Sequence, residues 1–307
     1  MVMIKVAIAK LRYFFINILV AIANVFIKRD KRIWLFGAWM GTKFADNPRY
    51  LYQYIIKNMD KCDVKRAIWV TRDIKVFEYL QGSGYEAYMC RSKASLYWHL
   101  KAGVHIVCNM YAQTGIYNGD IDGQFSGSAT KIQLWHGVGV KACGGLSNQG
   151  EKHKNKNKNK IISLLSSFSW LYPGRWTTCF WFATSEENKR VFVDDYYIDP
   201  KYVIVGNHLR INHDFILTEK ELKIVDYLTD KREEGYKLVL YLPTFRNGKQ
   251  EEKFVAPLSI DGFNCFLKEN RIVWVEKRHS ASTYKAEKSE YNNVLNLISR
   301  CRMSLFN

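Results

Sequence analysis

The segment "RAIWVTRDIKVFEYLQGSGYEAYMC", Arg66 to Cys90, decides the fold. A short apolar run at 66–71 precedes an amphipathic run at 73–84 that ends in glycine, and a second short run follows at 85–90. The short runs predict strands, and the longer run with helical spacing predicts a helix. A strand, a helix and a strand in this order are typical of a parallel sheet covered by helices.

The same alternation continues on both sides of this segment. It predicts further strands at 32–37, 104–109, 131–135, 179–185 and 201–207, and further helices at 47–59, 92–103 and 186–197. We expect Asn47 to be the N-cap of its helix, with Pro48 in the first turn, and Ser185 to cap the last. A second set begins near Thr218, with helices at 219–235 and 257–270 and strands at 236–243 and 271–277.

Two such sets predict an α/β protein with two Rossmann-like, doubly wound domains in a GT-B-like arrangement. The expected domains are 32–210 and 211–307, after an N-terminal segment 1–31. Sheets of this kind bind ligands outside the carboxyl ends of their strands, so polar residues at those ends are the candidates for chemistry.

The net charge restricts the partners of the chain. Its 307 residues carry a formal charge of +17, with a pI near 9.5. This excess favours an anionic partner: nucleic acid, an anionic membrane surface or a phosphate-rich polymer. The seven cysteines include no CxxC pair and are odd in number, which argues against a disulfide framework or a zinc site and indicates a reducing cytosol.

The N-terminal segment Val6–Ile27 is almost wholly apolar, with a thin polar stripe at Lys10, Asn17 and Asn24. The part without charged residues, 13–27, would span only about 22 Å as a helix, whereas the hydrocarbon core of a bilayer is roughly 30 Å thick. Since basic residues follow at once, we favour an apolar helix that lies in the cytoplasmic face of the membrane. A core-packed helix, a signal peptide and a short signal anchor are the alternatives.

The stretch "KIQLWHGVGVKACGG", 131–145, carries the first candidate site. His136 would end a strand, and Gly137 would let a ligand come close to the backbone. Lys141 would place a positive charge on a phosphate. An imidazole with a pKa of about 6.5 can accept a proton from a hydroxyl at neutral pH.

Two later strands end in similar groups. Thr244 and Arg246 follow one, and Lys277 and His279 follow the other. Three such groups after strand ends favour an enzyme that acts on phosphate, although each alone is also typical of a solvated turn. The "GDIDG" loop, 119–123, suggests a metal-binding pair, but its glycine-rich setting makes this reading weak, and we expect no metal or cofactor.

With these residues in place, the chain resembles the CDP-glycerol glycerophosphotransferase family of teichoic acid and capsule polymerases and primases, which have the GT-B fold. "QLWHGVGVKACG" resembles the family motif Q-x-WHG-x-x-x-K-x-x-G, and "GTKFADNPRYLYQYI" resembles its segment dN-x-(K/R)-Y-L. "LYLPTFR" resembles LY-x-PT-x-R, and "EKRHS" resembles K-x-HP.

The resemblance implies transfer of glycerol phosphate, or a related polyol phosphate, from CDP-glycerol to a hydroxyl of a lipid-linked or polymeric acceptor, with release of CMP. His136 would be the general base, and His279 would act at the phosphate or the leaving group. The implied substrate contacts are Gly137, Lys141, Thr244, Arg246, Lys277, Asn47 and Arg49. The implied location is the cytoplasmic face of the membrane, and oligomerisation is left open.

The chain also departs from the family pattern. "GNHLRIN", 206–212, replaces G-x-PR-x-D, so Arg210 is displaced by one position and receives no role. The family's later DYSS segment has no counterpart, and we therefore expect the second domain to be incomplete. The alternative functions are a truncated, inactive relative that binds acceptor or membrane and, ranked lowest, a nucleic-acid-binding protein, since no nucleic-acid-binding motif is present.

Overall fold

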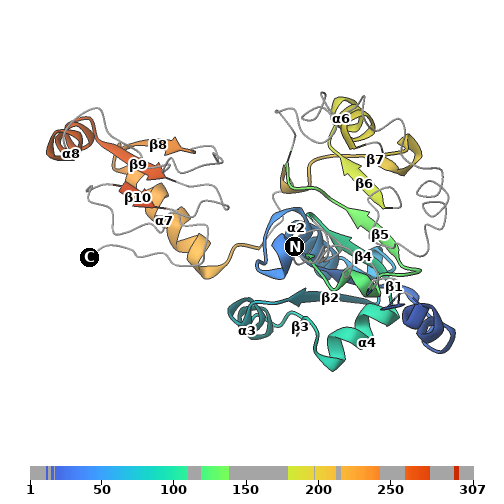
Figure 1. Cartoon of the computed structure of the whole chain (residues 1–307). Helices are drawn as coiled ribbons and strands as arrows, with labels where there is room; N and C mark the ends of the chain where they lie inside the picture. Colours follow the sequence, from blue (N-terminus) through green and yellow to red (C-terminus); the bar gives the residue numbers. More distant parts are fainter. Residues whose placement is uncertain are drawn as a thin grey trace, which may run out of the picture. The chain divides into compact units, whose positions relative to one another are not determined.

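The computed structural model describes residues 12, 15–16, 18–109, 119–137, 179–196, 198–211, 216–242, 260–276 and 294–296. The chain divides into two compact units, Met1–Phe215 and Ile216–Asn307 (Figure 1). The division lies within the range 207–217 where the sequence changes from the first set of elements to the second.

The sheet of unit 1 is parallel throughout, and its strand order is β3-β2-β1-β4-β5-β6-β7. The strands are β1 (Asp30–Phe36), β2 (Arg66–Thr71), β3 (Ala87–Met89), β4 (Ala102–Val107), β5 (Thr130–Gln133), β6 (Phe180–Ala183) and β7 (Val203–Val205). The order reverses between β1 and β4, which is the switch point where doubly wound sheets place their ligands.

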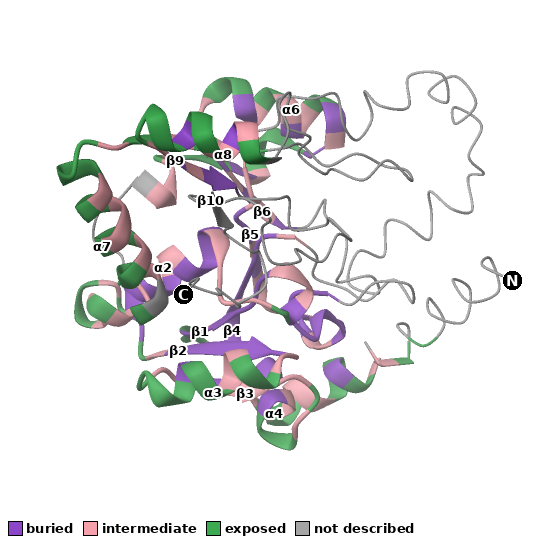
Figure 2. Ribbon diagram, turned by 90° about the vertical axis from the view of Figure 1, so that its left-hand side faces the viewer, coloured by how far each residue is buried: buried purple, intermediate pink, exposed green. Residues whose placement is uncertain are grey.

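Both faces of this sheet are apolar, as expected of a parallel sheet covered by helices. Successive residues of β1 alternate between two hydrophobic clusters: Leu35 packs in one with α6 (Glu186–Tyr196), and Phe36 packs in the other with α2 (Asp46–Lys57). Figure 2 shows the central strands buried and the outer side of α3 (Ile74–Gly82) exposed. The predicted doubly wound architecture is therefore present in unit 1.

Most predicted helix starts are confirmed by side-chain caps. Ser92 caps α4 (Lys93–Lys101), and the Ser185 hydroxyl accepts the amide hydrogen of Asn188 in α6. One expected cap is wrong. Helix α2 begins at Asp46 with Ala45 in the cap position, so Asn47 lies inside the first turn. The reason is that the Asp46 carboxylate accepts the backbone N–H of Asn47 at the helix start. The Asn47 side chain is therefore left to bind other groups.

Of the expected N-terminal helix, residues 12, 15–16 and 18–26 are described, and all of them are helical. Asn24 donates to the carbonyl of Gly127, and the Arg29 guanidinium donates to the carbonyls of His99, Ala102, Phe125 and Gly127. These contacts attach the end of the helix to the rest of unit 1. In the part of the chain that the structure describes, no helix combines the length and the apolar character that crossing a bilayer requires.

Unit 2 contains a parallel sheet with the order β10-β9-β8. Its elements are α7 (Glu219–Glu233), β8 (Lys237–Tyr241), α8 (Ile260–Glu269), β9 (Ile272–Glu276) and β10 (Val294–Asn296). A capping box between Thr218 and Glu221 starts α7, and Phe263 and Leu267 of α8 pack against β9. Four of these elements match the prediction, and β10 was not predicted.

Candidate active site

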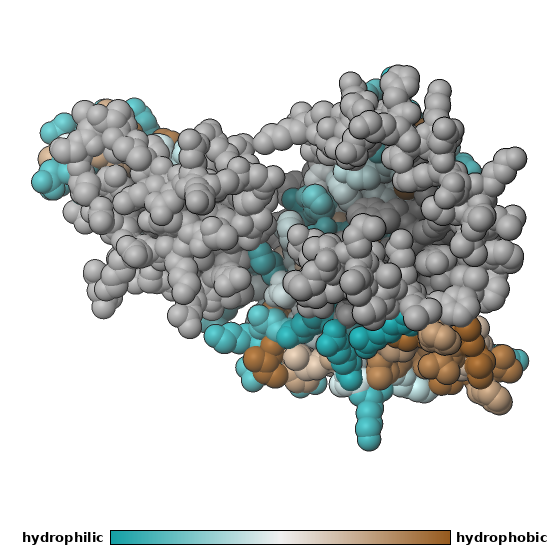
Figure 3. Space-filling view, in the orientation of Figure 1, coloured by the Kyte–Doolittle hydropathy of each residue, from teal (hydrophilic) through white to brown (hydrophobic). Residues whose placement is uncertain are grey.

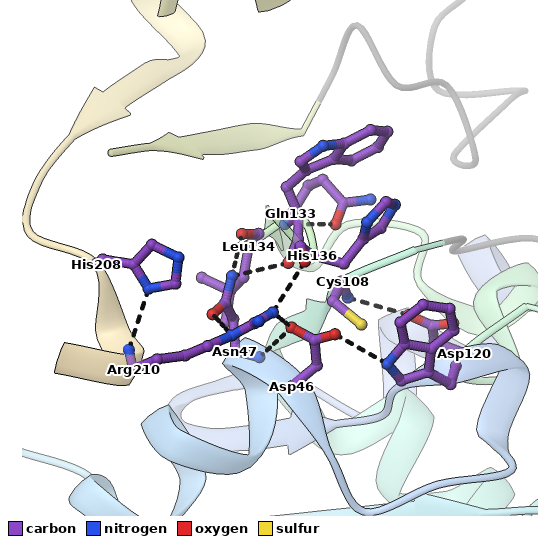
Figure 4. Close-up of polar contacts among 11 residues, drawn as sticks. Asp46, Asn47, Cys108, Asp120, Gln133, Leu134, His136, His208 and Arg210 are labelled. Carbon is purple, nitrogen blue, oxygen red and sulfur yellow. Dashed lines mark hydrogen bonds and ion pairs between the residues drawn. The ribbon is translucent and has the colours of Figure 1, made fainter. Parts of the chain in front are cut away.

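The structure describes four of the nine predicted site residues: His136, Gly137, Asn47 and Arg49. The other five, Lys141, Thr244, Arg246, Lys277 and His279, lie outside the described residues and remain predictions. His136 and Asn47 come from segments far apart in the sequence, yet both lie at the carboxyl edge of the unit 1 sheet (Figure 4).

His136 lies three residues after the end of β5, and two aromatic rings lie beside it. Its imidazole stacks on the indole of Trp135, with ring centroids 4.5 Å apart and planes 22° apart. The indole of Trp39, from the loop after β1, lies 5.6 Å away on centroids. A Cβ on Gly137 would meet no atom of the described residues within 4 Å.

The backbone before His136 has an unusual conformation that other elements hold. Trp135 has a φ of +55°, which is rare for a bulky residue and costs about 1–3 kcal/mol. The Asn47 amide group donates to the carbonyls of Leu134 and Trp135, at 3.0 and 2.9 Å. Arg210 donates to the carbonyl of His136 at 2.9 Å. Three consecutive carbonyls are thus bound by two side chains.

Arg210 also joins these elements to the start of α2. It lies in η8 (Leu209–Ile211), after β7, and its Nε donates to Asn47 Oδ1 at 3.1 Å. Its Nη2 pairs with the Asp46 carboxylate, which accepts the Trp39 indole N–H on its other oxygen at 3.0 Å. Partial burial lowers the pKa of the Arg210 guanidinium from its ordinary value, although the group stays protonated.

Asp120 joins the loops that follow β1 and β4. Its carboxylate is fully buried and accepts the backbone N–H groups of Met40, Cys108 and Asn109, at 2.7, 3.0 and 2.8 Å. Met40 has a φ of +56°, so this contact stabilises a second strained segment at the same edge. The Asp120 segment therefore occupies the switch point between β1 and β4.

Asp122 is also used inside the fold. It pairs with Arg72 at 2.9 Å, accepts the backbone N–H of Arg91, and its own N–H donates to Nε2 of His99. The "GDIDG" carboxylates thus bind protein groups. No group of three or more histidine, cysteine or acidic side chains among the described residues is arranged to hold a metal ion.

Arg49 is buried in the first turn of α2, with its guanidinium carbon 5.5 Å from the centre of the Phe44 ring and 5.9 Å from that of Tyr50. Its predicted contact with substrate, like that of Asn47, remains a prediction. The described contacts of Asn47 are with the His136 loop and Arg210.

Comparison with known proteins identifies the family. The model of the CDP-Glycerol:Poly(glycerophosphate) glycerophosphotransferase family matches residues 18–305. The chain belongs to this family. The match includes both units and the whole WHG segment, which confirms the resemblance drawn from the motifs.

Similar individual proteins agree with this assignment. The teichoic acid poly(glycerol phosphate) polymerase of Bacillus spizizenii is 22% identical over 275 residues, which are 86% of this chain and 64% of the relative. The wall teichoic acid polymerase TagF superposes with a TM-score of 0.55 at 17% identity, covering 92% of this chain and 69% of TagF. Its H444N variant soaked with CDPG for 15 minutes gives a TM-score of 0.56 at 17% identity, over 95% and 68%. The likeness confirms the α/β, GT-B-like fold class. The chain spans about two thirds of the length of these relatives.

Sequence reasoning missed several residues of this site. Arg210 was noticed as a departure from the family motif but received no role, because its partners lie 74 to 164 positions away. Asp46 and Trp39 were not singled out. The usable sequence signal for Asp46 was its place at the start of the family's dN segment, whereas its positive φ is visible only in the structure.

Proposed function

We propose that this protein transfers glycerol phosphate, or a related polyol phosphate, from CDP-glycerol to an acceptor hydroxyl and releases CMP. The acceptor oxygen forms a bond to the phosphorus that carries glycerol, and the bridging phosphorus–oxygen bond breaks with its electron pair going to CMP. The hydroxyl proton goes to His136. Such transfers depend on positioning and on stabilising charge more than on covalent catalysis.

The observation that carries the proposal is the place of His136. The family's WHG segment begins two residues after the end of β5, at the carboxyl edge of the sheet, where doubly wound folds act on ligands. The carbonyls of Trp135 and His136 accept hydrogen bonds from Asn47 and Arg210, and no described atom lies within 4 Å of a Cβ built on Gly137. A general base needs this combination of a fixed backbone and an accessible imidazole.

The test is CMP release from CDP-glycerol in the presence of a lipid-linked or glycerol-phosphate-primed acceptor. His136→Ala should lower the rate by about 10²–10⁴-fold, the usual contribution of a general base. Lys75→Ala, on the exposed side of α3, is the control and should leave the rate unchanged. If the folded wild-type protein releases no CMP, the proposed activity is refuted. The protein is then better described as an inactive relative that binds the acceptor.

We further propose that the N-terminal helix binds an anionic membrane surface. Its apolar side chains are exposed, Phe26 to 82%, and are spaced for one face of a helix: Phe15, Leu19, Ile22, Val25 and Phe26. Figure 3 shows apolar surface at this end of unit 1. Exposed basic residues follow at Lys28, Lys31 and Arg32, which would contact acidic headgroups.

Vesicle flotation tests this membrane proposal. Vesicles with acidic lipids should retain the wild-type protein, and zwitterionic vesicles should retain less of it. Phe26→Glu should reduce retention, whereas Ile74→Glu, a change at another exposed apolar residue, on α3, should not. Equal retention of Phe26→Glu and wild type would contradict the proposal.

A further inference from the structure

The contacts around the His136 loop share one feature: its three carbonyls, from Leu134 to His136, all accept hydrogen bonds from Asn47 or Arg210. Beyond the end of a strand, the backbone no longer has the hydrogen-bond partners of the sheet. These carbonyls therefore need donors from other parts of the protein. Because two side chains supply them all, the direction in which the loop leaves the sheet depends on those side chains.

Arg210 also decides which way the Asn47 amide faces. A carboxamide has one accepting oxygen and one donating nitrogen at its end. Arg210 Nε donates to Asn47 Oδ1, so the Asn47 nitrogen is turned toward the carbonyls of Leu134 and Trp135. Loss of Arg210 therefore affects all three loop carbonyls, one directly and two through Asn47.

The ion pair with Asp46 orients Arg210 itself. Asp46 is nearly buried, and its second oxygen accepts the indole N–H of Trp39, one of the two rings beside the His136 imidazole. The guanidinium is a rigid planar fork that directs its donors to a carboxylate, an amide oxygen and a backbone carbonyl at once, whereas a lysine ammonium has three donors but no such fork. Because the side chains of Asp46 and Asn47 are largely buried, removing one of their hydrogen-bond partners costs folding free energy.

We propose that Arg210 is a positioning residue for His136: it fixes the loop backbone and the Asn47 amide so that the imidazole stays between Trp135 and Trp39. The proposal rests on the general-base role proposed for His136 as far as catalysis is concerned. The placement of the ring can be tested without any activity.

The first experiment measures the ring directly. The protein has seven histidines, so selective ¹³C labelling of the imidazoles gives few signals, and His136→Asn assigns the one of interest. Stacking on Trp135 at 4.5 Å should shift the wild-type His136 signal upfield by ring current. Arg210→Ala should move this signal toward the value of a free imidazole. An unchanged signal in a folded Arg210→Ala variant would overturn the proposal, whether or not the protein is active.

The second experiment measures catalysis. A misplacement of about 1 Å costs on the order of 10²-fold in rate, so Arg210→Ala should lower kcat by about that factor while KM for CDP-glycerol changes little. Arg210→Lys keeps the charge near Asp46 but not the fork, and should lie between wild type and Arg210→Ala. Wild-type kcat in Arg210→Ala would also overturn the proposal.

Matched variants separate positioning from general destabilisation. Asn47→Asp keeps an acceptor for Arg210 but turns an oxygen toward the two loop carbonyls, so it should displace the His136 signal as Arg210→Ala does. It also serves if Arg210→Ala does not fold. Arg66→Ala removes an arginine of a comparable ion pair, with Glu86 at 2.6 Å, from the amino end of the sheet. It should leave both the His136 signal and kcat unchanged, and an equal effect would indicate only general destabilisation and overturn the proposal.

Discussion

Asp120→Asn removes the charge from the carboxylate that joins the loops after β1 and β4. The wild-type side chain is fully buried and accepts three backbone N–H groups, one on Oδ1 and two on Oδ2. An asparagine can keep its oxygen toward Cys108 and Asn109, but its NH₂ group then faces the N–H of Met40. Two donors would meet at a buried position, so that contact is lost.

The size of the effect follows from these contacts. A hydrogen bond to a charged group contributes about 1.5–3 kcal/mol, and a buried donor left without an acceptor costs about 1–3 kcal/mol more. The expected loss of stability is therefore about 3–5 kcal/mol. With a urea m-value of about 2–3 kcal/mol per molar for a domain of this size, the midpoint for unit 1 should fall by about 1.5 M.

Urea unfolding followed by near-ultraviolet circular dichroism measures this, because the packed aromatic rings of unit 1 give the signal. Asp194→Asn, on the exposed side of α6, is the control and should change stability by less than about 0.5 kcal/mol. EDTA should leave the wild-type midpoint unchanged, since the carboxylate binds backbone amides. A midpoint for Asp120→Asn equal to that of the control would refute the reasoning.

Three further predictions concern packing, pH and thiol reactivity. Gly37→Ala would place a Cβ 2.4 Å from the Asp120 carbonyl oxygen and should destabilise by about 3 kcal/mol in thermal unfolding, whereas Gly82→Ala, with open space around it, should stabilise by about 0.5–1 kcal/mol. Burial lowers the pKa of His99 below its ordinary 6.5, so the unfolded state binds more protons between the two values. Stability should be full above pH 6.5 and fall as the pH decreases below it, by up to about 1.4 kcal/mol per unit; a flat profile over this range would contradict the burial argument. Burial raises the pKa of Cys179 to about 12, so iodoacetamide should label exposed Cys265 in the native protein and spare Cys179, as peptide mass spectrometry would show.

Much of the fold was predictable because its signals are local. Residues 66–71 form a strand with the predicted bounds, and the glycine-ended helix that follows is α3. Ser185 and Thr218 mark helix starts by chemistry that acts within one turn. The short strand β10 was missed because three residues are too few for a periodic pattern.

The site was predictable only where a motif carried it. His136 was found from the WHG segment and the strand before it, and the structure places it after β5. Asn47 was selected from the family motif as a substrate contact, which stays a prediction, and it was also taken as a helix cap, because asparagine before proline is a strong local signal. Its actual partners, Leu134 and Trp135, lie 87 and 88 residues away, and no local rule points to them.

The position of Asp120 indicates how unit 1 differs from a nucleotide-binding Rossmann domain. In such a domain the crevice at the reversal of strand order receives the ligand, and a glycine lets the phosphate approach. Here a Cβ on Gly37 would collide with the chain's own Asp120 backbone, and the Asp120 carboxylate takes the amides that a phosphate would bind. Gly37 is thus required because the protein's own Asp120 backbone, and not a ligand, lies against it. Among the described residues at this edge, no atom lies within 4 Å of a Cβ built on Gly137, which follows His136 and its neighbouring indoles of Trp135 and Trp39. The place that receives the nucleotide in such a Rossmann domain is therefore occupied in unit 1 by the protein's own Asp120 segment.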